Sequence, residues 1–378
     1  MRDTIIYLDN NATTPSDNRV VDVVNVYFNQ LYGNASSLYS FGNKSKIVID
    51  KARNSISKLL DTESDTIYFT SGATESVNLA LKGLALNPKN SKKHIITCTT
   101  EHKAVLDTCD YLQSIGYEID YLPVNKLGAI DLQLLKSLIK EDTLLVCLMW
   151  VNNETGVIHP ISQIGEITKE AGVYFVCDGS QGVGKLPISV TESNIDILCF
   201  SGHKMYATKG VGGIYIDQKI TRQNKILPLI HGGGQENNLR SGTYNVPLIA
   251  GLGTAFEIAQ EEMQENKAHI EQIKNFLESE LLKIRQAYIN GKLSPRIFNT
   301  VNVCIPGFDS EVFIGVNNDI AVSNGSACNS ALVQPSHVLL AMGLSSNDAM
   351  NSLRISIGKS NTKNDIQLLI QRIKNFIN

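Results

Sequence analysis

Two apolar segments of the chain end in side chains that could hold a reactive cofactor. The run Ile197–Phe200 leads into Ser201–Lys204, and the run Tyr174–Cys177 leads into Asp178. A lysine that is buried or lies beside another cation has a lowered pKa and can form a Schiff base. A carboxylate paired with a pyridinium nitrogen makes a pyridoxal ring an electron sink. Alone, Lys204 would usually be a surface charge and Asp178 a helix N-cap, so the pair carries the prediction of a pyridoxal phosphate site.

Three more polar segments follow apolar runs. Ser71–Ser76 combines small residues with a helix start, which favours phosphate, and Thr74 can add a hydroxyl. His102 could stack on a ring or carry protons, and Asn152–Gly156 ends a further run. A capping box, a surface histidine and a simple turn are the ordinary alternatives. Because Ser71–Ser76 is neither a Walker A loop nor a G-x-G-x-x-G fingerprint, nucleoside triphosphates and dinucleotides are disfavoured.

One of the seven cysteines differs from the others. Cys328 lies in Val322–Ser330, a run of small and polar residues in which a thiol can be accessible enough to react. The remaining six lie in apolar runs or in a helical pattern, and we expect them to be buried: Cys98, Cys109, Cys147, Cys177, Cys199 and Cys304. The odd number and the lack of a C-x-x-C pair argue against a disulfide framework and a thiolate zinc site, so we expect no metal.

Three segments in the C-terminal half of the chain carry further candidate groups. Arg354 suits a bidentate grip on a carboxylate, although a structural salt bridge is the commoner role of an arginine. His231–Glu236 contains three consecutive glycines, which allow close backbone approach or a mobile lid. Arg240–Thr243 follows shortly after it. A plain linker is the ordinary alternative for this region, but the flanking His231 and Arg240 make that explanation less satisfactory.

Short apolar runs alternate with stretches of helical period, which predicts an α/β fold with a largely parallel sheet. The expected strands are Ile67–Thr70, His94–Thr97, Glu118–Leu122, Leu144–Trp150, Tyr174–Cys177, Ile197–Phe200 and Gly213–Ile216. The expected helices between them are Ala73–Leu86, Lys103–Ile115, Leu132–Ile139 and Ile161–Ala171. The carboxyl ends of such strands share one edge of the sheet, where ligands bind.

The length of 378 residues suits two domains of about 150 residues or more each. After residue 253 the pattern changes to a long charged helix over Thr254–Tyr288, a looser region and a final helix over Lys363–Ile377. We therefore predict a large domain over residues 19–253 and a smaller C-terminal α+β domain over 254–378. Residues 1–18 are too few to fold alone, so we expect this arm to dock on the smaller domain.

Composition excludes several classes of protein. The chain is 43% hydrophobic with a formal net charge of −3, so it is globular and has no overall positive field for nucleic acid or anionic membranes. We expect no direct nucleic-acid or membrane partner. No apolar run approaches the ~20 residues of a membrane span and no signal-peptide core opens the chain, so we expect a cytoplasmic protein with free thiols.

Together, these motifs resemble the cysteine desulfurases of the class V aminotransferase family, of the iron–sulfur-assembly and nitrogenase-maturation type. The resemblance spans almost the whole chain, and the order and spacing of the motifs make it specific. The matching segments are Tyr7–Pro15, Ser71–Ser76, Glu101–His102, Asn152–Glu154, Ser201–Lys204, His231–Glu236, Arg240–Thr243, Gly325–Cys328 and Pro335–Leu339. The resemblance implies the fold type I of pyridoxal-phosphate-dependent aminotransferases, with a mostly parallel large domain and a smaller α+β domain.

The resemblance also implies roles at a pyridoxal 5′-phosphate cofactor. Lys204 would bind the cofactor as a Schiff base, Asp178 would pair with its ring nitrogen, Gln181 would reach its ring hydroxyl and His102 would stack on the ring. The phosphate would be held by Thr74, Ser201 and His203, and by Thr243 from the partner subunit of an obligate homodimer.

For the reaction, the resemblance implies that L-cysteine becomes L-alanine. Asn153 and Arg354 would fix the substrate carboxylate, Lys204 would remove the Cα proton and His102 would carry protons. The Cys328 thiolate would attack the substrate sulfur, and the resulting persulfide would pass to an acceptor protein. Iron–sulfur assembly, tRNA thiolation and DNA phosphorothioation all remain open as the receiving pathway.

The chain departs from the family pattern beside its catalytic groups. Gly179-Ser180 stands where Ala-Ala is usual, Ala207-Thr208 where Gly-Pro is usual, and Asn329 where Thr is common. These departures leave the affinity for cofactor and the choice of acceptor open. A selenocysteine lyase, a small-amino-acid aminotransferase and a non-catalytic sulfur-transfer scaffold are the alternative hypotheses, and variants of Cys328 and the absorbance of the cofactor separate them.

Overall fold

The computed structural model describes residues 5–325 and 334–377. Its main part is a seven-stranded sheet in the order β2-β8-β7-β6-β5-β3-β4, in which β8 runs antiparallel to both neighbours and the other pairs are parallel. The strands are β2 (Ile67–Thr70), β3 (His94–Cys98), β4 (Glu118–Leu122), β5 (Thr143–Met149), β6 (Tyr174–Asp178), β7 (Ile197–Ser201) and β8 (Gly212–Ile216). The predicted α/β fold with a largely parallel sheet is confirmed.

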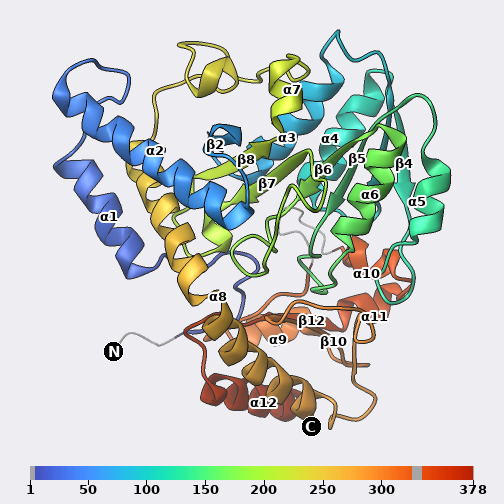
Figure 1. Ribbon diagram of the computed structural model, residues 1–378. Coiled ribbons are helices and arrows are strands. Elements are labelled where there is room, and N and C mark those ends of the chain that lie inside the picture. Colours follow the sequence, from blue (N-terminus) through green and yellow to red (C-terminus); the bar gives the residue numbers. More distant parts are fainter. Residues whose placement is uncertain (1–4, 326–333, 378) are drawn as a thin grey trace.

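Helices cover both faces of this sheet (Figure 1). Helices α3 (Ala73–Ala85) and α4 (Lys103–Ser114) share one core cluster with the sheet, and α2 (Ser40–Leu60) and α6 (Ile161–Ala171) share another. Successive strand residues enter different clusters, because side chains along a strand alternate between its faces. A strand buried on both faces is apolar throughout, which explains why the sequence showed these strands as continuous apolar runs.

Shorter elements complete the main part of the chain. They are α1 (Asn18–Asn29), α5 (Leu132–Leu138) and α7 (Gln218–Arg222). Helix α1 packs against α8 (Val246–Leu281), which also contacts α2. The layered arrangement leaves the carboxyl edge of the sheet facing the C-terminal part of the chain (Figure 1).

The C-terminal part has its own antiparallel sheet, β12-β10-β9. Its elements are β9 (Tyr288–Ile289), β10 (Thr300–Cys304), α9 (Ser310–Val316), β11 (Ile320–Ala321), α10 (His337–Ala341), α11 (Ser346–Met350), β12 (Ser352–Ser356) and α12 (Lys363–Ile377). The N-terminal arm joins this part through β1 (Ile6–Tyr7), which pairs in parallel with β11. An isolated bridge between Asp9 and Ser356 extends the contact.

Helix α8 begins earlier and ends earlier than predicted. The sequence indicated a helix over Thr254–Tyr288, whereas the structure has Val246–Leu281. Residues 246–253 are buried almost throughout, so they lack the polar face that marks a surface helix. Asn245 caps the true start by accepting the Leu248 N–H. The predicted boundary at residue 253 therefore lies within a helix that contacts both parts of the chain, and the division into domains stays a prediction.

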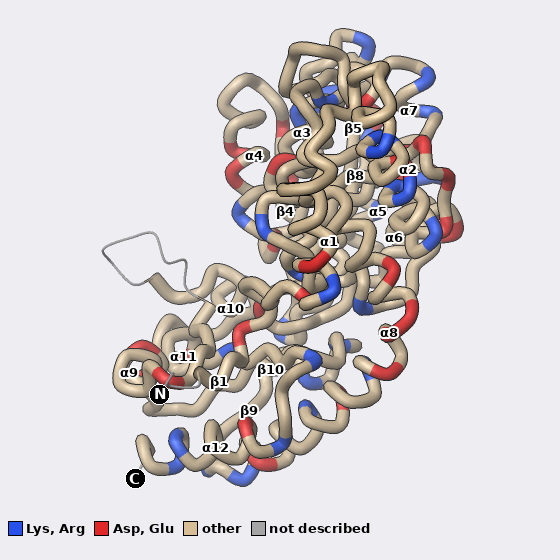
Figure 2. Tube along the Cα trace, turned by 90° about the vertical axis from the view of Figure 1, so that its left-hand side faces the viewer, with Lys and Arg blue, Asp and Glu red and all other residues tan. Residues whose placement is uncertain are grey.

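Charged residues of both signs are interspersed along the trace in Figure 2. Within the described ranges, no helix combines the length and apolar character needed to cross a membrane.

The close packing of α8 on α2 gives a stability prediction. A Cβ on Gly253 would lie 2.7 Å from both Cα and Cβ of Ala52. Gly253→Ala should therefore lower the free energy of unfolding by about 1–3 kcal/mol, through overpacking. Gly315→Ala is the matched control, because Gly315 is also helical but a Cβ there meets nothing within 4 Å. The control should be neutral or stabilising by up to ~1 kcal/mol, and equal losses in urea unfolding would contradict the packing argument.

Candidate active site

A cavity of about 650 Å³ opens at the carboxyl edge of the main sheet. It forms where parallel strands end, which is where ligands bind in open α/β sheets. Nine of the residues predicted for the site line it: Thr74, His102, Asn153, Asp178, Gln181, Ser201, His203, Lys204 and Arg354. They come from the ends of β2, β3, β5, β6 and β7 and from β12, so the fold brings together groups that are up to 280 residues apart, from Thr74 to Arg354.

Two predicted residues are not among those that line the cavity. Thr243 is exposed on the segment before α8. Its predicted role was toward the phosphate of a partner subunit, so a position outside this chain's own cavity leaves that prediction open. Cys328 lies outside the described residues.

Lys204 follows β7 in a short 3₁₀ turn and points toward the N-terminal arm. Its Nζ donates hydrogen bonds to the carbonyls of Asn11 and Ala12, each at 2.7 Å. Desolvation, followed by the positive charge of Arg354, lowers the pKa of Lys204 to about 8, although Asp178 opposes the shift. An amine with this pKa is partly neutral near pH 7, as a nucleophile or a proton acceptor requires.

Asp178 ends β6 and is 7% exposed. Its Oδ1 accepts hydrogen bonds from the Ser180 backbone N–H at 2.9 Å and from the Ser180 hydroxyl. Ser180 is one of the departures from the family pattern, and its hydroxyl gives the carboxylate a donor that alanine cannot provide. The other carboxylate oxygen remains available to a cationic ring nitrogen.

Gln181 connects the site to a lysine that the sequence analysis missed. Gln181 Nε2 donates to the Asn11 carbonyl at 3.0 Å, and Gln181 Oε1 accepts from Lys185 Nζ at 2.8 Å. Desolvation and the nearby charge of Lys204 lower the pKa of Lys185 to about 7. The only available signal was the position of Lys185 four residues after Gln181, in a run of small and apolar residues.

The opposite end of the cavity is suited to a phosphate. The start of α3 brings the N–H groups of its first turn to this point, and Gly72 before it has φ +154°, a conformation that favours glycine. Thr74 and Ser201 line the same cavity with hydroxyl groups. Desolvation and then the charge of Lys204 lower the pKa of His203 to about 4, so this imidazole is neutral at physiological pH.

His102 is the N-cap of α4. Its Nδ1 accepts the Ala104 N–H at 3.1 Å, so the neutral ring carries its proton on Nε2. The preceding residue, Glu101, is fully buried, with Oε1 accepting the Met149 N–H at 2.7 Å and Oε2 unpartnered within the described chain. Burial raises the pKa of Glu101 well above its usual range.

Arg354 lies on β12 and is oriented by the N-terminal arm. Its Nη2 binds Asp9 Oδ1 at 2.7 Å, and its Nη1 donates to the Asn153 carbonyl at 3.2 Å. Its Nε is buried and has no partner in the part of the chain that is described. A guanidinium with unused donors at the cavity wall is suited to a carboxylate.

Glu154 is a buried acid to which the sequence analysis assigned no individual role. Its Oε2 accepts a hydrogen bond from Ser336, the N-cap of α10, and a Cβ on Gly325 would collide with the same oxygen. Glu154 therefore packs against residues on both sides of the undescribed stretch 326–333. Desolvation raises the pKa of Glu154 to about 7, although Ser336 and Arg354 oppose the shift.

The six cysteines outside the Cys328 segment are buried and free, as predicted. Desolvation raises the pKa of each thiol, to about 11 for Cys98 and to about 12 for Cys109. Thiols with such pKa values stay protonated and unreactive.

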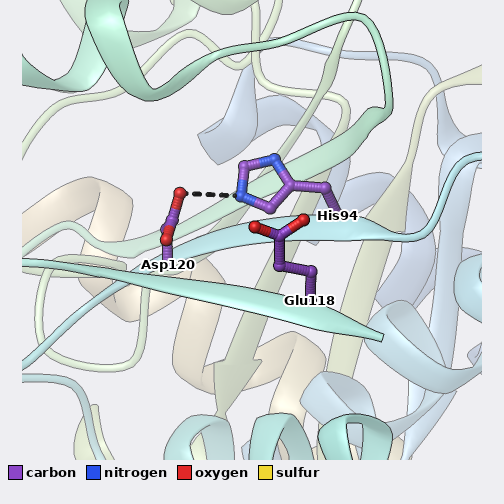
Figure 3. Close-up of side chains that lie close together, drawn as sticks. All are labelled: His94, Glu118 and Asp120. Atoms are coloured by element: carbon purple, nitrogen blue, oxygen red, sulfur yellow. Dashed lines mark hydrogen bonds and ion pairs between the residues drawn. The ribbon is translucent and has the colours of Figure 1, made fainter. Parts of the chain in front are cut away.

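A second titratable cluster lies at the opposite edge of the sheet, where β3 and β4 begin (Figure 3). His94 Nε2 and Asp120 Oδ2 are 3.0 Å apart, and the ligand atoms of His94, Glu118 and Asp120 lie within 4.8 Å of one another. Lys140 Nζ is already 2.5 Å from Glu118 Oε1. The lysine supplies the positive charge that a cation would bring, so this cluster is explained as an ion-pair network.

Comparison with known proteins agrees with this geometry. The family described as Aminotransferase class-V matches residues 6–369, so the chain belongs to that family. Cysteine desulfurase IscS of Rickettsia bellii (strain OSU 85-389) is 45% identical over 375 residues, which are 99% of this chain and 91% of that protein. The family predicted from the motifs is confirmed, and within it the chain falls among the cysteine desulfurases.

Solved structures extend the similarity to the fold. A structure titled NifS-like protein has a TM-score of 0.91 at 37% identity and covers 99% of both chains. A structure titled SspA in complex with cysteine has a TM-score of 0.84 at 36% identity, covering 94% of this chain and 99% of that one. The predicted fold type is thereby confirmed.

The raised pKa of Glu154 predicts a pH dependence of stability. The folded state holds a proton on Glu154 between its ordinary value of 4.5 and about 7, whereas the unfolded state releases it. The free energy of unfolding should therefore fall as pH rises through this window, with Glu154 contributing about 3 kcal/mol of the fall. Glu154→Gln stays neutral and should remove that contribution.

The measurement is urea unfolding of the wild type and Glu154→Gln from pH 5 to pH 7.5. Glu192→Gln, at an exposed position, is the control and should keep the wild-type slope. Parallel slopes for wild type and Glu154→Gln would show that Glu154 does not bind the proton.

Proposed function

We propose that this protein uses pyridoxal 5′-phosphate to convert L-cysteine into L-alanine and carries the sulfur as a persulfide on Cys328. The observation that carries the proposal is that one cavity holds Lys204, with a pKa lowered to about 8, together with Asp178 and Arg354. A covalent amine, an acid for a ring nitrogen and a cation for a carboxylate are the three groups that an amino acid bound to this cofactor needs.

The residues of the cavity fit the cofactor. Lys204 would bind it covalently, Asp178 would hold its ring nitrogen, Gln181 its ring hydroxyl and His102 one face of the ring. Thr74, Ser201 and His203 would hold its phosphate at the start of α3, where N–H groups and the helix dipole favour an anion. When bound, the cofactor supplies an electron sink that stabilises negative charge at the substrate Cα.

The chain's own groups then bind and deprotonate the substrate. Arg354 and Asn153 would hold the substrate carboxylate, and Asp9 keeps the guanidinium in place. Lys204 is partly neutral near pH 7 and can accept the Cα proton. His102, with a proton on Nε2, can return a proton to the product side chain.

Sulfur transfer needs a second nucleophile. The Cys328 thiolate would form an S–S bond to the substrate sulfur as the C–S bond breaks, and the electron pair of that bond remains with the carbon. Protonation of that carbon gives alanine, and the enzyme keeps a persulfide. The persulfide sulfur would go to an acceptor protein in iron–sulfur assembly, tRNA thiolation or DNA phosphorothioation.

The proposal includes a homodimer with shared sites and a cytoplasmic location. Thr243 is exposed and lies outside its own cavity, which supports a contact with the phosphate of a partner subunit. The six buried, free cysteines of the described chain are in keeping with a reducing compartment.

The test is an absorbance spectrum of the purified protein, followed by intact-mass analysis after L-cysteine is added. The wild type should show a visible cofactor band and gain the mass of one sulfur atom. Cys328→Ala should keep the band, gain no sulfur and form alanine at least about 100-fold more slowly.

Two other outcomes would overturn the proposal. A band with unchanged alanine formation in Cys328→Ala would favour a lyase or an aminotransferase. A protein without any band after incubation with the cofactor would favour a non-catalytic scaffold.

A further inference from the structure

Lys185 is a partly buried lysine that the proposed chemistry does not use. It lies in the turn that follows β6 and lines a small cavity between this turn, the N-terminal arm and α8. Its ammonium makes one hydrogen bond, to Gln181 Oε1 at 2.8 Å, and within the described chain no carboxylate lies within ion-pair distance of it. Burying a cation against a single neutral acceptor costs free energy, and the lowered pKa of Lys185 reflects that cost.

The contact with Gln181 fixes the direction of an amide. An ammonium can only donate hydrogen bonds, so the atom of Gln181 that faces Lys185 must be the carbonyl oxygen. The NH₂ group is then turned the other way, where Nε2 donates to the Asn11 carbonyl at 3.0 Å. Gln181 and Asn11 both line the large cavity, so the NH₂ group is turned toward a residue of the cavity wall.

The Asn11 carbonyl connects the hydrogen bonds of Lys185 and Gln181 to Lys204. It accepts from Gln181 Nε2 at 3.0 Å and from Lys204 Nζ at 2.7 Å. A chain of hydrogen bonds thus runs from Lys185 through Gln181 and Asn11 to Lys204. Hydrogen bonds in such chains polarise one another, so the positive charge of Lys185 strengthens the donor character of the Gln181 NH₂ group.

The charged groups around Lys185 leave its effect on the cavity unscreened. Lys204 and His203 face it from the turn after β7, and Asp178 ends the neighbouring strand β6. Asp17 and Lys359 line the small cavity, but they bind each other. Asp17 also binds Arg19, so its charge is already compensated.

We propose that Lys185 is a positioning residue that holds the Gln181 amide with its NH₂ group toward the cavity, so that Gln181 binds an anionic oxygen on the cofactor ring. This inference rests on the proposed function, because the anionic oxygen is the 3-oxygen of pyridoxal 5′-phosphate. Lys185 lines the small cavity and is not among the residues that line the large one.

Electrostatics gives the direction in which loss of the Lys185 charge should shift the pH midpoint of the visible absorption band. A cation behind Gln181 favours the more negative state of the cofactor ring and so lowers the pH at which the visible absorption band changes. Removing the cation leaves the Asn11 carbonyl as the one described hydrogen-bond partner that sets the direction of the amide, so the NH₂ group is held less firmly toward the anion. Both changes raise the titration midpoint.

The experiment is a pH titration of the visible band in the holoenzyme. Lys185→Met should raise the midpoint by about one pH unit. Lys185→Gln, which keeps a polar side chain but cannot fix the direction of an amide, should also raise it and serves if the Met variant folds poorly. Lys185→Arg should restore the wild-type midpoint, because it keeps a donor-only cation.

A double-mutant cycle separates positioning through Gln181 from a plain charge effect. In a Gln181→Leu background, adding Lys185→Met should produce a clearly smaller shift, because only the direct effect of the charge remains. An equal shift in both backgrounds, or wild-type midpoints for Lys185→Met and Lys185→Gln, would overturn the inference. A wild type without a visible band would instead overturn the proposed function itself, so the two failures are distinct.

Discussion

The carbonyl of Asn11 is the point on which the active site depends. It belongs to the N-terminal arm, yet it accepts hydrogen bonds from Lys204 and Gln181 of the main part of the chain. The Asn11 side chain binds the Thr300 hydroxyl at 2.9 Å and the Asn153 carbonyl at 3.0 Å. Three regions far apart in sequence therefore meet at one residue, and the position of Lys204 follows from how they are joined.

Around this junction, desolvation lowers the pKa values of two lysines and raises those of two buried glutamates. Lys204, Lys185 and Arg354 lie at or just behind the cavity, whereas burial raises the pKa values of Glu101 and Glu154 above their ordinary range. The surplus of positive charge in a poorly solvated space favours a ligand with a phosphate and a carboxylate. The desolvation that lowers the pKa of Lys204 therefore also favours an anionic ligand in the cavity.

Much of the fold could be predicted because its strands are buried on both faces. The bounds of β2, β4, α6 and α12 matched the predicted ranges, since apolar runs and clear turn residues defined them. The start of α8 was missed because its first turns are apolar all round and show no helical period.

The candidate site was predictable where a residue ends a strand or comes soon after one. Asp178 and Ser201 end strands, and Lys204 follows β7. Lys185 contacts the Gln181 amide, and Glu154 contacts Ser336, which is 182 residues away in sequence. Sequence alone does not show which side chain faces which. The same limit applies to Thr243, whose predicted contact is on another subunit.

The burial of six cysteines sets the stoichiometry of sulfur in this protein. Thiols that are buried and have raised pKa values can neither attack a persulfide nor receive its outer sulfur. Under the proposed function, Cys328 is therefore the one cysteine of the seven that would carry sulfur. Each chain can then hold one sulfur atom at a time, so a second turnover must wait until an acceptor has emptied the first.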